Sequence, residues 1–369
     1  MTDPLALRRR RLNGLPVERP RVAPLAKRIA LSPWTWVFVV ATLLYAGVLA
    51  WELSSMMRPV RVEGGEVSGV NASAIRQAAR LALPTVAVWL ALYVLLDRFR
   101  PQRPLFWWLA LGWGASIATA ASLVVNTWAA QEMNIGGSQN DPATGARAAV
   151  FVAPFVEEAA KASVLFLIAL AHRYRLVSVV SGAVLAGLSA AGFAFVENIL
   201  YYARAIVYSS QQIGVGDPDA AIRQIVLLRG VLTAFGHPLF TTMTGIGVIV
   251  AVRTHSKVVR VAAPLAGYLV AALMHMGFNA GASFVTDPQQ QLFVYVLVIL
   301  PLVLSAAVWI VRRVPAEGRR LRSRLDDYVR AGWLSEGDAY ALARQRSRWY
   351  AVRVAATRGP RALLATWRV

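Results

Sequence analysis

The sequence predicts an all-α membrane protein, a polytopic bundle of about eight transmembrane helices with basic cytoplasmic tails at both ends. Of the 369 residues, 57% are hydrophobic, and many of these fall in long apolar runs. The runs reach about 20 residues, the length that an α-helix needs to cross a hydrocarbon core of roughly 30 Å. Lysine and arginine collect in the tails and in alternate connections, as expected of a membrane topology.

Eight apolar runs mark the expected spans, at about residues 33–53, 81–97, 105–130, 148–171, 177–203, 230–252, 261–284 and 291–311. The second run is the shortest. The chain then divides into a basic cytoplasmic N-tail at 1–32, a transmembrane domain at 33–312 and a basic helical tail at 313–369. We read the first apolar run as an uncleaved span, because it is longer than the core of a signal peptide.

The charge of the connections predicts their side of the membrane. Both tails and the connections "DRFRPQRP", "HRYR" and "RTHSKVVR" are basic, whereas "QEMNIGGSQNDPATG", "SSQQIGVGDPDAA" and "TDPQQQ" carry little positive charge. This alternation fits eight spans in a plasma membrane, with both termini cytoplasmic. The segment 54–80 holds four arginines and fits less well. The preference for arginine over lysine suggests a GC-rich, bacterial source.

Composition also excludes several kinds of chemistry. The chain has no cysteine, which removes disulfides, thiol catalysis and thiolate metal sites. The net charge of +20 could indicate a nucleic-acid partner, but the basic residues follow the topology instead of gathering on one soluble face. We therefore expect no nucleic acid as a partner.

The C-terminal tail has its own helical signals. Leu321, Leu325, Tyr328 and Val329 recur at helical spacing, and Ser335 with Asp338 resembles a capping box that opens a second helix, "EGDAYALARQRSR". A basic amphipathic pair of this kind can lie on anionic lipid or bind a partner, and a solvated tail is an equal alternative.

Ionisable residues inside four consecutive spans are the most unusual feature of the sequence. They are Glu157, Glu158 and Lys161 in "FVEEAAKAS", Glu197 in "GFAFVENILYY", His237 in "AFGHPLF" and His275 in "HMGFN". Helical rise places all of them roughly 9 to 15 Å below the outer surface, in one layer. A charge near the bilayer centre costs at least about 2.5 kcal/mol, so such groups usually face a bundle interior or an aqueous cavity.

The charges in this layer do not balance. With every glutamate ionised, Lys161 leaves a net charge of minus two, which a divalent cation or bound protons must relieve. A purely structural ion-pair network is the simpler alternative, and for Lys161 the role of charge partner to Glu157 is favoured by the i, i+4 spacing. Glu157 and Glu158 point about 100° apart on a helix, so only one of them can face a reaction centre directly.

Two mechanisms of water activation fit these residue types. Two histidines and one carboxylate suffice to hold a catalytic Zn²⁺, with a further carboxylate to accept a proton. A metal-free site could use glutamate as the base, with histidine and Asn279 stabilising an oxyanion. The sequence leaves both open. The HExxH motif is absent, which argues against a zinc site on a single helix. No span has a secure mid-membrane aspartate, which disfavours a pair of catalytic aspartates. The best candidate for a catalytic serine, Ser189, lies deeper than the ionisable layer, among small residues typical of helix packing, which disfavours serine catalysis.

The motifs "EEAAK", "FAFVE", "GHPLFT" and "HMGFN", in this order on successive spans, resemble those of the PrsW family of intramembrane proteases, distant relatives of the CAAX-prenyl endopeptidases. The resemblance covers about residues 145–285. It implies Glu/His-dependent and usually metal-dependent hydrolysis of a single-span, membrane-anchored protein near the outer side of the membrane, as in site-1 cleavage of an anti-sigma factor.

By this resemblance we expect Glu157, Glu158 and Asn279 to be catalytic. We expect Glu197, His237 and His275 to bind a divalent metal, with Zn²⁺ favoured, and Lys161 to be their structural charge partner. Two other classes of function compete. A proton-coupled transporter also places glutamate and histidine inside the membrane, although no inverted repeat is obvious. A non-catalytic membrane scaffold would keep the fold and bind partners through its tail.

Overall fold

The structure of the chain, a computed structural model, describes residues 24–62, 65–99, 101–132, 142–176, 178–211, 217–285, 287–360 and 362–363. Most of the expected N-tail at 1–32 lies outside these residues. The chain forms two compact units, Val40–Arg313 and a second unit made of Met1–Val39 with Val314–Val369. Each unit is described by itself.

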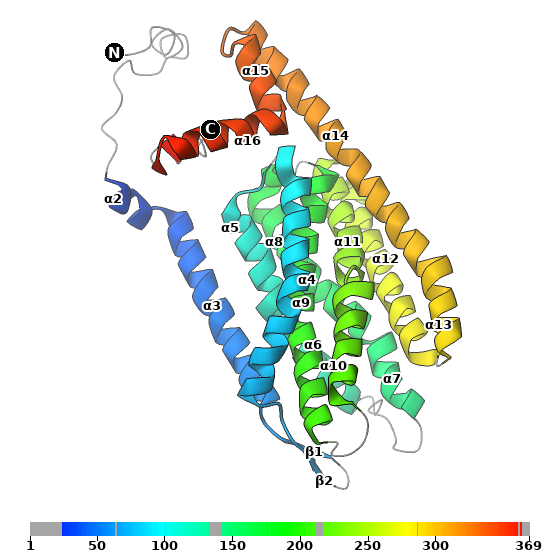
Figure 1. Cartoon of the computed structure of the whole chain (residues 1–369). Helices are drawn as coiled ribbons and strands as arrows, with labels where there is room; N and C mark the ends of the chain where they lie inside the picture. The colour runs from blue at the N-terminus through cyan, green and yellow to red at the C-terminus, as the bar shows by residue number, and fades with distance from the viewer. Residues whose placement is uncertain are drawn as a thin grey trace. The chain divides into compact units, whose positions relative to one another are not determined.

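The first unit is helical apart from the short antiparallel hairpin of β1 (Val60–Val62) and β2 (Gly65–Val67) among the described residues (Figure 1). Its helices are α3 (Pro33–Met56), which begins in the other unit, α4 (Ala72–Leu96), α5 (Pro104–Gly112), α6 (Thr119–Glu132), α7 (Pro142–Phe151), α8 (Ala153–His172), α9 (Val179–Gln211), α10 (Pro218–Leu227), α11 (Gly236–Arg253), α12 (Lys257–Phe284), α13 (Pro288–Val294) and the start of α14 (Leu300–Arg330). Among the described residues, three π-helical segments interrupt them: η2 (Trp113–Ala118), η4 (Leu228–Leu232) and η5 (Tyr295–Ile299).

Seven segments of the described chain are long and apolar enough to cross a membrane, which confirms an all-α polytopic fold. The expected span at 148–171 corresponds to α7 and α8. Helix α8 is 20 residues long and packs against α6, α9, α11 and α12, but its three charged residues set it apart from the seven apolar segments. The second span starts earlier than expected, at Ala72, because the alanine stripe Ala74, Ala78 and Ala82 is buried against α9.

Helix α9 is the central element of this unit. Of its most apolar window 83% is buried, and it packs against α4, α5, η2, α8, α10 and α11. Small residues allow this close approach. A Cβ atom on Gly114 of η2 would lie 1.7 Å from the carbonyl oxygen of Ser189, and one on Gly192 would lie 2.1 Å from that of Leu111. Since these contacts are to backbone, only glycine fits at either position.

The sixth span is broken. Its π-helical segment η4 ends at Leu232, and α11 begins at Gly236. Carbonyl groups freed by such a break must find donors inside the membrane. Side chains of other spans supply them: Thr85 donates to Gly230 (2.9 Å), Trp89 to Ala234 (3.1 Å) and Tyr295 to Leu232 (2.7 Å). The break is therefore a satisfied and specific part of the fold.

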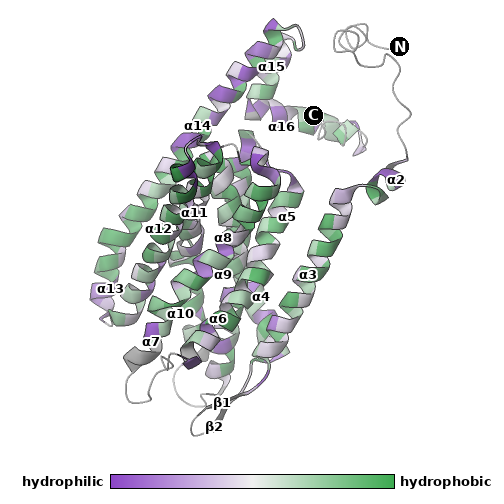
Figure 2. Cartoon of the chain, turned by 180° about the vertical axis from the view of Figure 1, so that it is seen from behind, coloured by the Kyte–Doolittle hydropathy of each residue, from purple (hydrophilic) through white to green (hydrophobic). Residues whose placement is uncertain are grey.

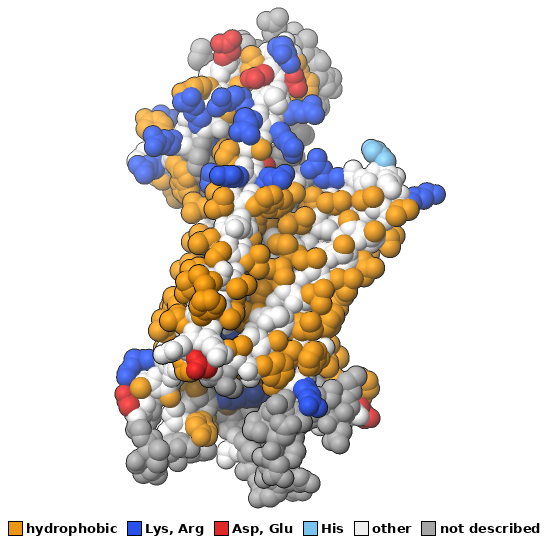
Figure 3. All heavy atoms as spheres, turned by 90° about the vertical axis from the view of Figure 1, so that its right-hand side faces the viewer, with side chains coloured by type: hydrophobic (Ala, Val, Ile, Leu, Met, Phe, Trp, Pro, Cys, Tyr) orange, Lys and Arg blue, Asp and Glu red, His pale blue; other side chains and the backbone are white. Residues whose placement is uncertain are grey.

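The outside of this unit is apolar. Hydropathy colouring shows hydrophobic residues along most of each bundle helix (Figure 2). Large hydrophobic side chains cover the face over α12 and the helices that follow it (Figure 3), among them Val261, Leu265, Leu297 and Leu302, each more than half exposed. Apolar surface of this extent marks contact with lipid.

The second unit contains the short helix α2 (Leu25–Ala30) and, after α14, the helices α15 (Glu336–Ala343) and α16 (Gln345–Thr357). The expected capping box is present, because Ser335 and Asp338 bond each other's backbone N–H. Leu325 is buried against Ala339 and Ala343, with Leu321 and Val329 beside them. The helix predicted from "EGDAYALARQRSR" was expected to be continuous, but it is divided at Arg344, whose backbone is extended.

Candidate active site

The two adjacent glutamates of α8 have different surroundings. The carboxylate of Glu158 is fully buried: Oε1 lies 2.6 Å from Nζ of Lys161 and 3.1 Å from Nδ1 of His275, and Oε2 accepts a hydrogen bond from Thr241 (2.7 Å). Glu157 lines a cavity instead, and within the described part of the chain its buried Oε2 accepts no hydrogen bond. The angle of about 100° between neighbouring helical positions produces this division.

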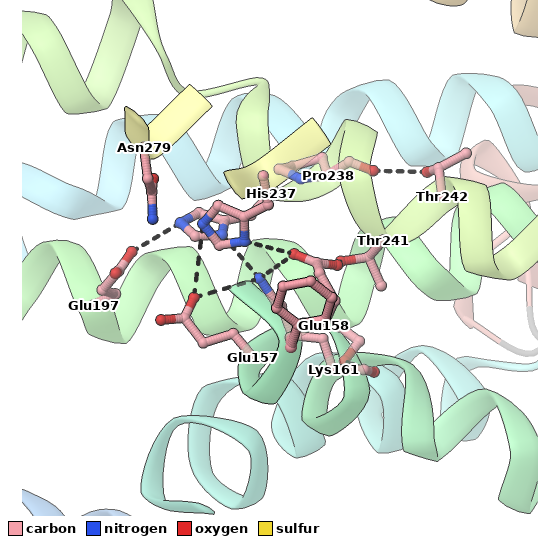
Figure 4. Close-up of polar contacts among 12 residues, drawn as sticks. Glu157, Glu158, Lys161, Glu197, His237, Pro238, Thr241, Thr242 and Asn279 are labelled. Carbon is pink, nitrogen blue, oxygen red and sulfur yellow. Dashed lines mark hydrogen bonds and ion pairs between the residues drawn. The ribbon is translucent and has the colours of Figure 1, made fainter. Parts of the chain in front are cut away.

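Lys161 lies between the two glutamates and the first histidine (Figure 4). Its ammonium is 2.6 Å from Glu158 and 3.7 Å from Glu157, and it donates a 2.9 Å hydrogen bond to Nδ1 of His237. It also lies 4.4 Å from the ring centroid of Phe193 on α9. The expected charge pairing of Lys161 with Glu157 is present, but the shorter ion pair is with Glu158.

Glu197 of α9 binds two groups from the broken sixth span. Its Oε2 accepts from Nε2 of His237 (2.8 Å) and from Nη2 of Arg229 (2.6 Å). Since lysine can only donate, Nδ1 of His237 is the acceptor of the bond from Lys161, and Nε2 carries the hydrogen given to Glu197. Contacts on both nitrogens therefore fix the tautomer of His237.

His275 of α12 packs against the same group of side chains. Its ring stacks on Phe240 at a centroid distance of 5.2 Å and meets His237 edge-on at 5.1 Å. With Nδ1 directed at Glu158, Nε2 lies 3.9 Å from Oε2 of Glu157. The stacking and the carboxylate contact hold the ring in one orientation.

A cavity of about 330 Å³ joins these groups. Its polar lining includes Asn126, Glu157, Glu197, Asn198, Tyr201, Arg229, His237, His275 and Asn279. Glu158 and Lys161 lie behind this lining. Of the residues expected to form the site, the structure thus brings Glu157, Glu197, His237, His275 and Asn279 to one hollow, with Glu158 and Lys161 in direct contact with them.

Three ligand atoms in the described chain lie close enough to share a metal ion. One atom each of Glu157, His237 and His275 falls within 4.8 Å of the other two. Two imidazoles and a carboxylate are a donor set that suits Zn²⁺ with an open coordination position. The unpartnered Oε2 of Glu157 adds an acceptor with no hydrogen-bond donor of its own, so the residues present fit a divalent cation. The carboxylate in this group is Glu157, where the sequence had suggested Glu197.

Two further candidates have defined places. The Nδ2 atom of Asn279 donates to the carbonyl of Ala149 (2.8 Å), which ties α12 to α7 at the edge of the cavity. Ser189 is fully buried, and its hydroxyl donates to the backbone carbonyl of Lys161 (2.8 Å). The position of Ser189 against Gly114 accords with the small-residue packing face inferred from its neighbours.

The sequence reasoning missed Arg229 and the role of Thr241. Arg229 was placed just before the sixth span, whereas the helix already begins at Pro218, so that its guanidinium lies inside the bundle. An unbalanced charge of minus two was the available signal for a second cation. With Arg229 included, three carboxylates and two cations leave a net charge of minus one when all are ionised.

The fold and this cluster define a polytopic membrane protein with a carboxylate–imidazole site inside its spans. The family model described as PrsW family intramembrane metalloprotease matches residues 102–306, more than half of the chain and all of the cavity lining except Thr85. The chain belongs to this family and is an intramembrane protease. No curated protein and no solved structure matches it.

Proposed function

We propose that the cavity lined by Glu157, His237 and His275 is the active site, and that it cuts a single-span membrane protein near the outer side of the membrane. The observation that supports this most strongly is the convergence of three ligand atoms within 4.8 Å beside one cavity. The orientation rests on the basic tails and the alternating charge of the connections. Site-1 cleavage of an anti-sigma factor in a bacterial plasma membrane is the finer form of the proposal.

Each histidine is oriented by a carboxylate. Glu158 accepts from Nδ1 of His275, and Glu197 accepts from Nε2 of His237. The other ring nitrogen of each histidine carries a lone pair, an arrangement typical of histidine metal ligands. The lone pair of His237 Nδ1 accepts from Lys161 in this structure, so a metal ion bound there would replace that hydrogen bond. We therefore assign Glu157, His237 and His275 to the metal, and Glu158 and Glu197 to the support of the two rings.

A divalent metal, Zn²⁺ in our proposal, would supply Lewis acidity, lowering the pKa of a water molecule and polarising the scissile carbonyl. The chain itself would exclude bulk water and present the peptide. Glu197 is the second carboxylate of the cavity, and in addition to orienting His237 it would accept a proton from the attacking water. Asn279 at the cavity edge would offer its amide to the peptide backbone.

A metal-free mechanism is the second candidate, and one contact favours it. The ammonium of Lys161 already lies 2.9 Å from Nδ1 of His237 and 3.7 Å from Oε2 of Glu157, among the proposed metal ligands. In this alternative Lys161 remains as the internal cation. Glu157, which lines the cavity, takes the proton from water, and His275 with Asn279 stabilises the oxyanion.

Cleavage of a single-span reporter in proteoliposomes tests the proposal. We expect Glu157→Gln and His275→Ala each to lower kcat at least 100-fold. Glu52→Gln is the matched control, because Glu52 is also a buried carboxylate within a span but bonds Thr119 (2.9 Å) and does not line the cavity. Full activity in both Glu157→Gln and His275→Ala would overturn the assignment of this cavity as the active site. Proton-coupled flux without cleavage would favour a transporter.

Metal analysis of the purified protein separates the two mechanisms. One equivalent of divalent metal in the wild type, lost in Glu157→Gln and in His275→Ala, is the expected result. Activity that survives exhaustive chelation with no metal bound would replace the metal assignment by the glutamate-base mechanism.

A further inference from the structure

Arg229 is a half-buried cation that the proposed chemistry does not use. Its side chain is 24% exposed and forms a two-pronged contact: Nη2 binds Oε2 of Glu197 (2.6 Å) and Nε binds the side-chain oxygen of Asn198 (3.0 Å). The guanidinium also lies 3.8 Å from the ring centroid of Tyr201. The three contacts, to Glu197, Asn198 and Tyr201 of α9, hold the guanidinium in one orientation.

The contact with Glu197 bears directly on His237. The same oxygen, Oε2, accepts from Arg229 and from Nε2 of His237. A carboxylate held at one oxygen by a guanidinium has little freedom to rotate, and arginine forms such planar contacts better than lysine does. The position of Arg229 therefore determines where the imidazole of His237 is held.

We propose that Arg229 is a positioning residue, which fixes Glu197 so that Glu197 holds Nε2 of His237 and keeps Nδ1 as the acceptor nitrogen, bonded to Lys161 in this structure. This inference rests on the proposed function, because it assigns Arg229 a part in the same site. Because Oε2 of Glu197 is already shared between a guanidinium and an imidazole, we assign Glu197 to the support of His237 and not to the metal.

Steady-state cleavage of the single-span reporter tests the proposal first. Supporting groups around a metal ligand typically contribute 10- to 100-fold to activity or metal affinity. We expect Arg229→Gln to lower kcat by that factor with KM within twofold, and Arg229→Lys, which keeps the charge but not the fork, to recover part of the loss. Arg223→Gln is the matched control, since Arg223 on α10 is 69% exposed and pairs with Asp217.

A double-mutant cycle tests the route through Glu197. If Arg229 acts by holding Glu197, then Arg229→Gln should add less than threefold to the loss caused by Glu197→Gln. Multiplicative losses would overturn the proposal. So would a rise in KM at unchanged kcat, which would mark Arg229 as a substrate anchor.

Nitrogen-15 NMR of the imidazoles gives a readout that does not depend on activity. The chain has four histidines, so the signals can be assigned by substitution of each. We expect Arg229→Gln and Arg229→Lys to move the His237 signals and to leave those of His172 and His255 unchanged. If the His237 signals stay in place in both variants, the positioning role of Arg229 is wrong, whether or not a substrate is cleaved. If the His237 signals move in the variants but the wild type cleaves no substrate, only the proposed function is wrong.

Discussion

The Nδ1 atom of His275 lies 3.1 Å from Oε1 of Glu158, and its Nε2 atom lies 3.9 Å from Oε2 of Glu157. The two adjacent glutamates thus address opposite nitrogens of one ring. In the proposed site, Glu158 orients the imidazole and Glu157 binds the same metal ion as His275. This pairing gives neighbouring residues separable roles.

Zinc affinity should distinguish these roles. We expect Glu157→Gln to abolish high-affinity binding and Glu158→Gln to weaken it by about 10- to 100-fold, as is typical for a supporting carboxylate. Competition with a chromogenic chelator measures both. Thr241→Val, which removes only the hydroxyl bonded to Glu158, is the control and should have a smaller effect. Equal losses in the two glutamate variants would contradict the division.

Lys161→Met should destabilise the fold. It leaves the buried carboxylate of Glu158 without its cation, and removing one partner of a buried ion pair costs roughly 3 to 5 kcal/mol. Removing both charges in Glu158→Gln/Lys161→Met should recover much of this loss. The midpoint of thermal unfolding, measured for all variants in the same lipid or detergent, ranks the stability of the wild type, Lys161→Met and the double variant. If Lys161→Met alone is as stable as the wild type, the ion pair between Lys161 and Glu158 contributes little to stability.

Gly192→Ala should weaken the packing of α9 against α5. The added methyl would meet the carbonyl oxygen of Leu111 at 2.1 Å, and overpacking of this kind costs about 1 to 3 kcal/mol. Gly47→Ala is the matched control, because no described atom outside its own helix backbone lies within 4 Å of its Cβ position. Thermal unfolding of the two variants should therefore differ, with Gly47→Ala equal to or above the wild type. A neutral Gly192→Ala would contradict the close approach.

Ser189→Ala should keep its proteolytic activity. The hydroxyl of Ser189 donates to the carbonyl of Lys161, and its loss should lower stability by only about 1 kcal/mol. The reporter assay at saturating substrate is the measurement. A loss of activity on the scale of His275→Ala, in a variant that inserts and folds normally, would reopen serine catalysis.

Much of this structure could be predicted from apolar runs, because a bilayer imposes both the length and the composition of a span. The convergence of Glu157, Glu197, His237 and His275 followed from their similar depth. The choice between Glu157 and Glu197 as the proposed third metal ligand did not, because it depends on the rotation of each helix and on a partner outside the motifs. Arg229 escaped notice because a single arginine at the end of an apolar run reads as a topology signal.

The broken sixth span could be predicted only in part. Pro238 lacks the N–H that would bond the carbonyl of Ala234, so a kink can be expected there. The donors that satisfy the freed carbonyls come from α4 and η5, far away in the chain. A break of this kind is a tertiary feature, since it exists only where other spans supply the missing hydrogen bonds.

The segment Pro288–Arg330 has no buried residue in its most apolar window. Its Tyr295 nevertheless donates a hydrogen bond to the carbonyl of Leu232 in the broken sixth span. Its hold on the bundle is completed by Val303 and Ala306, which pack beside Leu239 and Phe240. Lipid supplies most of the remaining contact. Harsh solubilisation should therefore loosen this span first and expose a carbonyl close to the site. Purification in nanodiscs or mild detergent should preserve an activity that stronger detergents remove without unfolding the central helices.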